Sequence, residues 1–70
     1  MERIPVQSSN IASVGYDADG QTLEVEFLHG GVYQYFGVPQ AAFDDFMNAP
    51  SKGSYFQQNI RNAYSCSKVG

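Results

Sequence analysis

The chain has 70 residues, of which 43% are hydrophobic, 14% aromatic and 16% charged. This composition excludes a disordered chain and predicts one modest core, because so short a domain buries only about 60% of the surface that its unfolded form exposes. Seven acidic and four basic side chains give a formal net charge of -3, which excludes long-range attraction to nucleic acid and leaves only a local cluster of cations to bind it.

The cysteine content and the hydropathy pattern bear on the compartment. Cys66 is the single cysteine, so no internal disulfide can form, which fits a reducing cytoplasm. Residues 1–10 lack the apolar run of a signal peptide, and no later stretch approaches the length of a membrane span. We therefore expect a cytoplasmic protein with no membrane attachment.

In chain order, residues 1–10 show no hydrophobic periodicity. They are interpreted as a short N-terminal segment from which Ile4 and Val6 dock onto the domain. From residue 11 to 36, apolar and polar residues alternate between groups of turn residues, which predicts three antiparallel strands. The apolar residues of this alternation are Val14, Tyr16, Leu23, Val25, Phe27, Tyr33 and Tyr35.

The first turn is expected at residues 17–20, where an Asp-Gly pair tolerates the positive φ angles of a tight hairpin. A two-residue loop there sets Tyr16 opposite Leu23 and Val14 opposite Val25. These four side chains then share one apolar face of the sheet.

The second turn can be placed by parity, because a slip of one residue moves every side chain to the other face. A two-residue Gly30-Gly31 loop would set Phe27 against Gln34. A three-residue loop at 29–31, with a left-handed Gly31, instead sets Phe27 opposite Tyr33 and Val25 opposite Tyr35. The three-residue loop is therefore predicted.

The opposite face of this sheet is mixed. It carries Glu24, Glu26 and Gln34 together with an apolar strip, Leu28, Val32 and Phe36. This strip and the unpaired edge strands are the usual places for association, so they are the candidate interface for a protein partner or a homodimer.

Two helices are expected after the strands. Pro39 suits the first position of a helix that spans 39–48, and Pro50 stops it. Ser51 looks like the N-cap of a second helix that runs to about residue 63 with Phe56 and Ile60 on one stripe, and the polar tail 65–70 is expected to be loose. The predicted fold is α+β, a three-stranded antiparallel meander followed by two helices packed on one face (βββαα), in a single domain 1–70.

Several motifs, taken in order and spacing, resemble the KTSC domain family. They are Ser8-Ser9-x-Ile11, Val14-Gly15-Tyr16-Asp17, Leu23-x-Val25-x-Phe27, Gly31-Val32-Tyr33-x-Tyr35, Val38-Pro39, Ala49-x-Ser51-x-Gly53 and Phe56-x-x-x-Ile60-Arg61. Tyr33-x-Tyr35 corresponds to the YxY motif of that family. The family is named from the C-terminus of certain lysyl-tRNA synthetases and also occurs as stand-alone bacterial and phage proteins. The resemblance implies no catalytic residues, and an RNA-binding role has been suggested for the family.

Tyr33 and Tyr35 share a face, and paired aromatic residues on a sheet can either pack in the core or stack nucleic-acid bases. The parity argument places both tyrosines under the helices, which favours the core. A stacking platform remains the alternative.

The start of the second helix is the candidate nucleic-acid surface. Its residues are Lys52, Gly53, Ser54 and Arg61, with help from Lys68. Unpaired N–H groups at a helix start favour an anion, and Gly53 allows close approach, although an ordinary Ser51 N-cap explains the same pattern. So few cations predict weak, salt-sensitive binding.

Catalytic and metal chemistry lack their usual residue sets. His29 lies in a turn and Cys66 in the tail, with no third group to orient them, and one histidine with one cysteine cannot close a metal site. Asp44 and Asp45 point in different directions from a helix, and so small a fold is expected to leave little room for a pocket beside its core. We therefore expect no catalytic residue, metal or cofactor.

The function predicted from the sequence is a small non-catalytic binding module. Association with a protein partner through the open sheet face is the first hypothesis. Weak binding of RNA or another nucleic acid through the start of helix two is the second hypothesis, and the net negative charge disfavours it.

Overall fold

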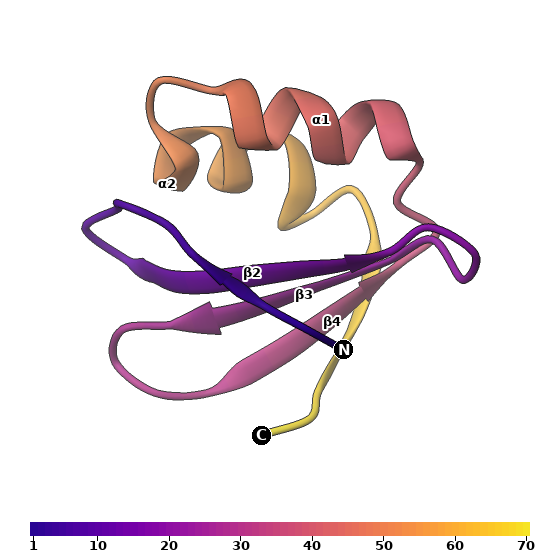
Figure 1. The fold of residues 1–70 in the computed structure, drawn as a ribbon, viewed down its shortest axis with the longest axis horizontal. Coiled ribbons are helices and arrows are strands. Elements are labelled where there is room, and N and C mark those ends of the chain that lie inside the picture. Colours follow the sequence, from indigo (N-terminus) through magenta and orange to yellow (C-terminus); the bar gives the residue numbers. More distant parts are fainter.

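In the computed structural model, which describes residues 1–70, the chain forms a five-stranded antiparallel sheet whose strands lie in chain order. The strands are β1 (Ile4–Pro5), β2 (Ile11–Asp17), β3 (Thr22–Phe27), β4 (Val32–Phe36) and β5 (Ser65–Lys68). The helices α1 (Gln40–Asn48), α2 (Lys52–Tyr55) and the π-helix η1 (Phe56–Ile60) lie on one face of this sheet (Figure 1). The α+β class is confirmed, but the prediction of three strands missed both outer strands.

The two additional strands come from the ends of the chain. β1 pairs with β2, with Ile4 opposite Val14. The tail 65–70 is not loose: β5 pairs with β4, with Cys66 opposite Tyr35. Both ends therefore hydrogen-bond to strand edges whose N–H and C=O groups would otherwise face water, and β4 is not the free edge that the sequence suggested.

The first hairpin has the predicted register, with Val14 opposite Val25 and Tyr16 opposite Leu23. The connection is longer than predicted, because strand pairing ends where Asp17 faces Thr22. The positive φ of this turn falls on Gln21, at 49°, and not on the Asp-Gly pair.

The second hairpin has the predicted parity but a register displaced by two residues. Val25 faces Tyr33 and Leu23 faces Tyr35, so the predicted pairing of Val25 with Tyr35 is wrong. Gly30 and Gly31 both have positive φ, 101° and 96°, and the Phe27 N–H donates to the Gly31 carbonyl oxygen. The three-residue loop is therefore 28–30 instead of 29–31, and the paired residues of β3 and β4 keep their predicted faces.

The first helix begins one residue later than predicted, with Pro39 as its N-cap residue, and ends at Asn48 before Pro50. The second begins as predicted, because the Ser51 hydroxyl accepts from the Ser54 N–H.

The second helix does not continue as an α-helix to residue 63. From Phe56 to Ile60 it is a π-helix, in which the Arg61 N–H donates to the Phe56 carbonyl oxygen at 2.9 Å. The wider turn keeps Phe56 and Ile60 buried while Ala63 is exposed.

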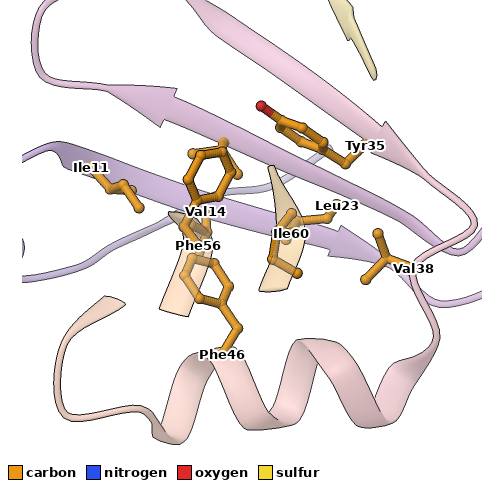
Figure 2. Packing of buried hydrophobic residues seen from close by; sticks show 9 residues of the cluster. Ile11, Val14, Leu23, Tyr35, Val38, Phe46, Phe56 and Ile60 are labelled. Carbon is orange, nitrogen blue, oxygen red and sulfur yellow. The ribbon is translucent and has the colours of Figure 1, made fainter. Parts of the chain in front are cut away.

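The core lies between the helices and the sheet. Phe46 points from α1 toward the sheet, as Figure 2 shows, and is fully buried together with Ile60, Leu23 and Val25. The remaining members of the core are Ile11, Val14, Tyr35, Val38 and Phe56. The apolar face predicted from the alternation of the strands is therefore the face that the helices cover.

The other face of the sheet carries a polar network that holds the N-terminus. Arg3 forms an ion pair with Glu24 and donates from Nε to Ser13 Oγ at 3.1 Å. Ser13 in turn donates to Glu26, and Gln34 Nε2 donates to Glu24 Oε1 at 2.8 Å. Glu24 is only 7% exposed, so its carboxylate depends on these partners.

This network predicts acid sensitivity. The hydrogen bond from Gln34, followed by the hydrogen bond and charge of Arg3, lowers the pKa of Glu24 below its ordinary value of 4.5, against the opposing effect of burial. A lowered folded-state pKa stabilises the fold above the ordinary value, and this contribution is lost as the pH falls through the folded value. We expect Glu24→Gln to have a flatter acid limb than the wild type in urea unfolding measured across pH. Asp19→Asn, at an exposed turn, is the control; equal acid limbs in wild type and Glu24→Gln would contradict the prediction.

None of the helices is long and apolar enough to cross a membrane.

Candidate functional site

A groove of about 790 Å³ opens beside the core, between the second helical segment and one end of the sheet. Its walls come from the start of β2, the β3–β4 turn, β4, the α2–η1 segment and β5. The lining residues are Ser9, Asn10, Ile11, Phe27, Leu28, His29, Tyr33, Tyr35, Gly53, Phe56, Gln57, Arg61, Asn62 and Cys66. The expectation that this fold leaves little room for a pocket beside its core is therefore wrong, because the helices do not cover the whole apolar face.

Aromatic rings form the floor of the groove. The Phe27 ring stacks on His29 (5.5 Å between centroids, 11° between planes) and meets the edges of Tyr33 and Phe56 at 5.7 and 5.4 Å. Phe56 also meets Tyr35 edge to face at 5.3 Å. Edge-to-face contacts between rings are favourable beyond simple area burial, so these rings form one connected aromatic surface.

The charge of the groove differs from that of the whole chain. Arg61 is the only Lys or Arg side chain in the lining, and none of the seven acidic side chains lines it. Arg61 Nη1 donates to Gln57 Oε1 at 3.1 Å, which holds the guanidinium at the rim and leaves other N–H donors for a ligand. The π-helix contributes Phe56 and Gln57 to the groove, and such segments are frequent at functional sites.

The start of the second helical segment borders the same groove. A smaller polar hollow of about 240 Å³ adjoins it and shares Ser9, Asn10, Gly53 and Gln57 with it, while Ser54 lines only the smaller one. Of the predicted nucleic-acid residues, Gly53 and Arg61 therefore meet in the groove and Ser54 lies next to it.

Lys52 and Lys68 do not join this set. The Lys52 ammonium donates to the Ala49 carbonyl oxygen at 3.3 Å, at the end of α1, and lines neither hollow. Lys68 lies in β5 opposite Tyr33, also outside the lining. The groove therefore has fewer cations than the sequence suggested for this surface.

The YxY pair occupies both core and groove. Tyr35 is 5% exposed and Tyr33 is half-buried. Burial, together with the neighbouring Cys66 thiol, raises the pKa of Tyr35 to about 12.

This pKa can be measured by alkaline titration of the tyrosine absorbance. We expect an ionisation step near pH 12 that disappears in Tyr35→Phe and remains in Tyr33→Phe. Because the folded pKa lies above the ordinary value of 10.0, the stabilisation is complete below that pH and is lost as the pH rises toward the folded value. An unchanged titration curve in Tyr35→Phe would contradict the assignment.

The predicted protein interface is divided between the two faces of the molecule. Leu28, 60% exposed, lines the groove, whereas Phe36, 41% exposed, lies on the open face. Val32 is half-buried, and its N–H donates to the Gly70 carbonyl oxygen at 3.1 Å. The N-terminal segment also covers part of the open face, because Glu2 lies over Gly15. The three residues do not form one strip.

No sequence pattern brought His29 and Cys66 together, yet both line the groove. Sequence reasoning also missed Asn10, Phe27 and Phe56 as site residues. The signal for Phe27 and Phe56 was present in the alternation and in the helical stripe, but both patterns were assigned to the core. Only the position of the short helices over the sheet shows that one end of the apolar face stays open.

A sheet covered on one face by two short helical segments, with an aromatic groove at its end, defines a small α+β domain. The chain belongs to the KTSC domain family, whose model matches residues 7–64. The match contains β2, β3, β4 and the helices, and it leaves out β1 and β5.

Relatives and a solved structure agree with this assignment. An uncharacterised protein of Stutzerimonas stutzeri is 43% identical over 58 residues, which cover 83% of this chain and 82% of that protein. A lysine–tRNA ligase of Nostoc punctiforme is 41% identical over 58 residues, 83% of this chain but 10% of the ligase. The crystal structure of a KTSC domain protein from Yersinia pestis superposes with a TM-score of 0.96 at 48% identity, covering 99% of this chain and 97% of that one.

Proposed function

We propose that this domain is a non-catalytic binding module and that the groove is its binding site. The observation that carries the proposal is the aromatic floor of a groove of about 790 Å³ with a single guanidinium at its rim. Ligand sites are typically concave and largely apolar, with a few polar groups that orient the ligand. The free thiol of Cys66 is compatible with the reducing cytoplasm in which we place the protein.

The arrangement of the groove favours binding over catalysis. His29 stacks on Phe27, and no side chain forms a hydrogen bond that would orient its ring toward Cys66. Nucleophilic catalysis needs a base that is oriented by a third group. No group of three or more His, Cys, Asp or Glu side chains could hold a metal ion.

A protein segment is the first ligand class that we propose. The groove replaces the open sheet face as the proposed surface, because Leu28 lines it and because the N-terminal segment lies over Gly15 on the other side. An exposed aromatic groove is a common seat for an extended or helical peptide. Association through the remaining open face, where Phe36 is exposed, would give a mass that rises with concentration.

RNA is the second candidate ligand, and one observation favours it. Arg61 and Gly53 line the same groove as the stacked Phe27 and His29 rings, and single-stranded bases stack on aromatic side chains. With one cation in the lining, such binding would be weak and would fall steeply with salt. The relatives that are named lysine–tRNA ligases make the test worthwhile.

The experiment is an amide NMR titration of the labelled chain with short single-stranded and hairpin RNAs and with a set of tetrapeptides. We expect shifts at residues 9–11, 27–35 and 53–62, and we expect Tyr33→Ala to weaken them. Phe36→Ala, on the opposite face, should leave them unchanged. Shifts confined to the open face would favour that surface instead, and no groove shift with any probe would refute the binding groove.

A further inference from the structure

The lining of the groove also indicates the chemistry of its ligand, and this inference rests on the proposed binding groove. We propose that the groove takes a short peptide segment in which a single carboxylate lies next to an aromatic side chain. Three features carry this assignment: the aromatic floor, the distribution of charge and the size of the groove.

The floor accounts for the aromatic side chain. Phe27 presents ring edges and faces to Tyr33, Phe56 and His29 within 5.7 Å. His29 is exposed, so its stacked ring extends this surface to the mouth of the groove. A planar side chain can add to such a cluster by further stacked or edge-to-face contacts, which contribute beyond simple area burial.

The charge distribution accounts for a single carboxylate. In a chain of net charge -3, the lining contains one guanidinium and no acidic side chain. A guanidinium fork binds a carboxylate through two parallel hydrogen bonds, and Gln57 occupies only one donor of Arg61. A polyanion would be attracted by only one cation in the groove and repelled by the seven carboxylates elsewhere on the chain. A ligand with one negative charge therefore fits the groove better than a ligand with many.

The amide side chains at the rim and the volume of the groove indicate that the ligand is a peptide segment. Asn10, Gln57 and Asn62 place side-chain amides around the aromatic floor, and an amide offers both donors and acceptors to a peptide backbone. A volume of about 790 Å³ lies in the range of sites for small ligands. The groove therefore accommodates a few residues of a partner and not the surface of a folded domain.

The test uses four N-acetylated, C-amidated tetrapeptides, titrated into the labelled full chain at low salt. The first is Gly-Gly-Asp-Phe, and in the others Asn replaces Asp, Lys replaces Asp, or Ala replaces Phe. We expect groove shifts with the first and at least about tenfold weaker binding for each of the others, the typical loss when a charge-assisted hydrogen bond or a buried ring is removed.

Two variants assign the charge effect to one side chain. Arg61→Gln should weaken the Asp peptide about tenfold and leave the Asn peptide unchanged, because the guanidinium is the proposed partner of the carboxylate. Lys52→Gln removes a cation that lies outside the groove and should change neither peptide. Arg61 is exposed, so the fold is expected to survive, and an unchanged spectrum outside the groove verifies this.

The outcomes separate this inference from the function on which it rests. Equal binding of the Asp and Asn peptides, or tighter binding of the Lys peptide, would contradict the proposal that the ligand carries a carboxylate. The groove would still be a binding site. Groove shifts with RNA and none with any peptide would overturn the peptide ligand and favour the second candidate. No groove shift with any probe would overturn both proposals.

Discussion

Phe46→Ala is expected to remove about a third or more of the free energy of unfolding. Phe46 is 0% exposed and points from α1 into the layer between the helices and the sheet (Figure 2). Its ring also stacks on Tyr55 at 5.8 Å. Truncation of a buried phenylalanine costs about 3–5 kcal/mol, and a domain of this length has a total stability of only about 4–10 kcal/mol. Urea unfolding followed by circular dichroism measures the loss.

The matched control is Phe36→Ala, which truncates an exposed phenylalanine instead of a buried one. Phe36 is 41% exposed on the open face, so its removal should cost clearly less than the removal of the fully buried Phe46. If the two variants lost similar stability, the core would not lie between helices and sheet as described. A further variant, Phe46→Leu, keeps most of the apolar volume and should fall between the two.

Gly15→Ala is expected to detach the N-terminal segment from the sheet. A Cβ atom at Gly15 would lie 2.5 Å from the Glu2 carbonyl oxygen and 3.2 Å from Arg3 Cγ. The backbone at Glu2 must move away, and Arg3 then loses its ion pair with the buried Glu24. Leaving a buried polar group without its partner costs about 1–3 kcal/mol, and more for a charged group. Urea unfolding gives the loss, and the NMR signals of residues 1–5 should show their release.

The cause can be tested by removing the segment itself. In a chain that lacks Met1–Arg3, Gly15→Ala should cost little, because nothing remains for the new methyl group to displace. Gly53→Ala is a second control: its nearest atoms are side-chain atoms of Ser8 and Asn10 at 3.6 and 3.7 Å, and alanine favours a helix. An equal cost of Gly15→Ala with and without the segment would show that the strand itself rejects the methyl group.

If the peptide proposal holds, the YxY motif has a double role. Tyr35 completes the core and Tyr33 forms part of the groove floor. A substitution at Tyr35 would then change stability and binding together, whereas one at Tyr33 would act mainly on binding. This difference separates the two residues experimentally, although they lie two positions apart on one strand.

Local patterns were enough to assign the apolar residues of the three predicted strands to a face. The alternation of apolar residues placed Val25, Tyr33 and Tyr35 toward the helices, and the structure confirms this. The Ser51 N-cap and the stop at Pro50 were also predictable, because capping and proline effects act within a few residues.

The exact partner of each strand residue, in contrast, was decided by tertiary structure. Gly30 and Gly31 can both adopt positive φ, so two placements of a three-residue loop satisfy the same parity, and only packing selects between them. The pairing of β5 with β4 depends on a free strand edge that the tail meets in space.

The groove is also a feature that depends on tertiary structure. The order of the three central strands and the two helical segments, and the apolar face of the sheet, could be predicted from the sequence alone, because they follow from the spacing of side chains along the chain. Tertiary structure decided that short helices, one of them widened into a π-helix at Phe56–Ile60, leave the end of that face open. It also placed Arg61 in the same groove as Phe27 and Tyr33, since residues distant in sequence meet only when the whole chain packs.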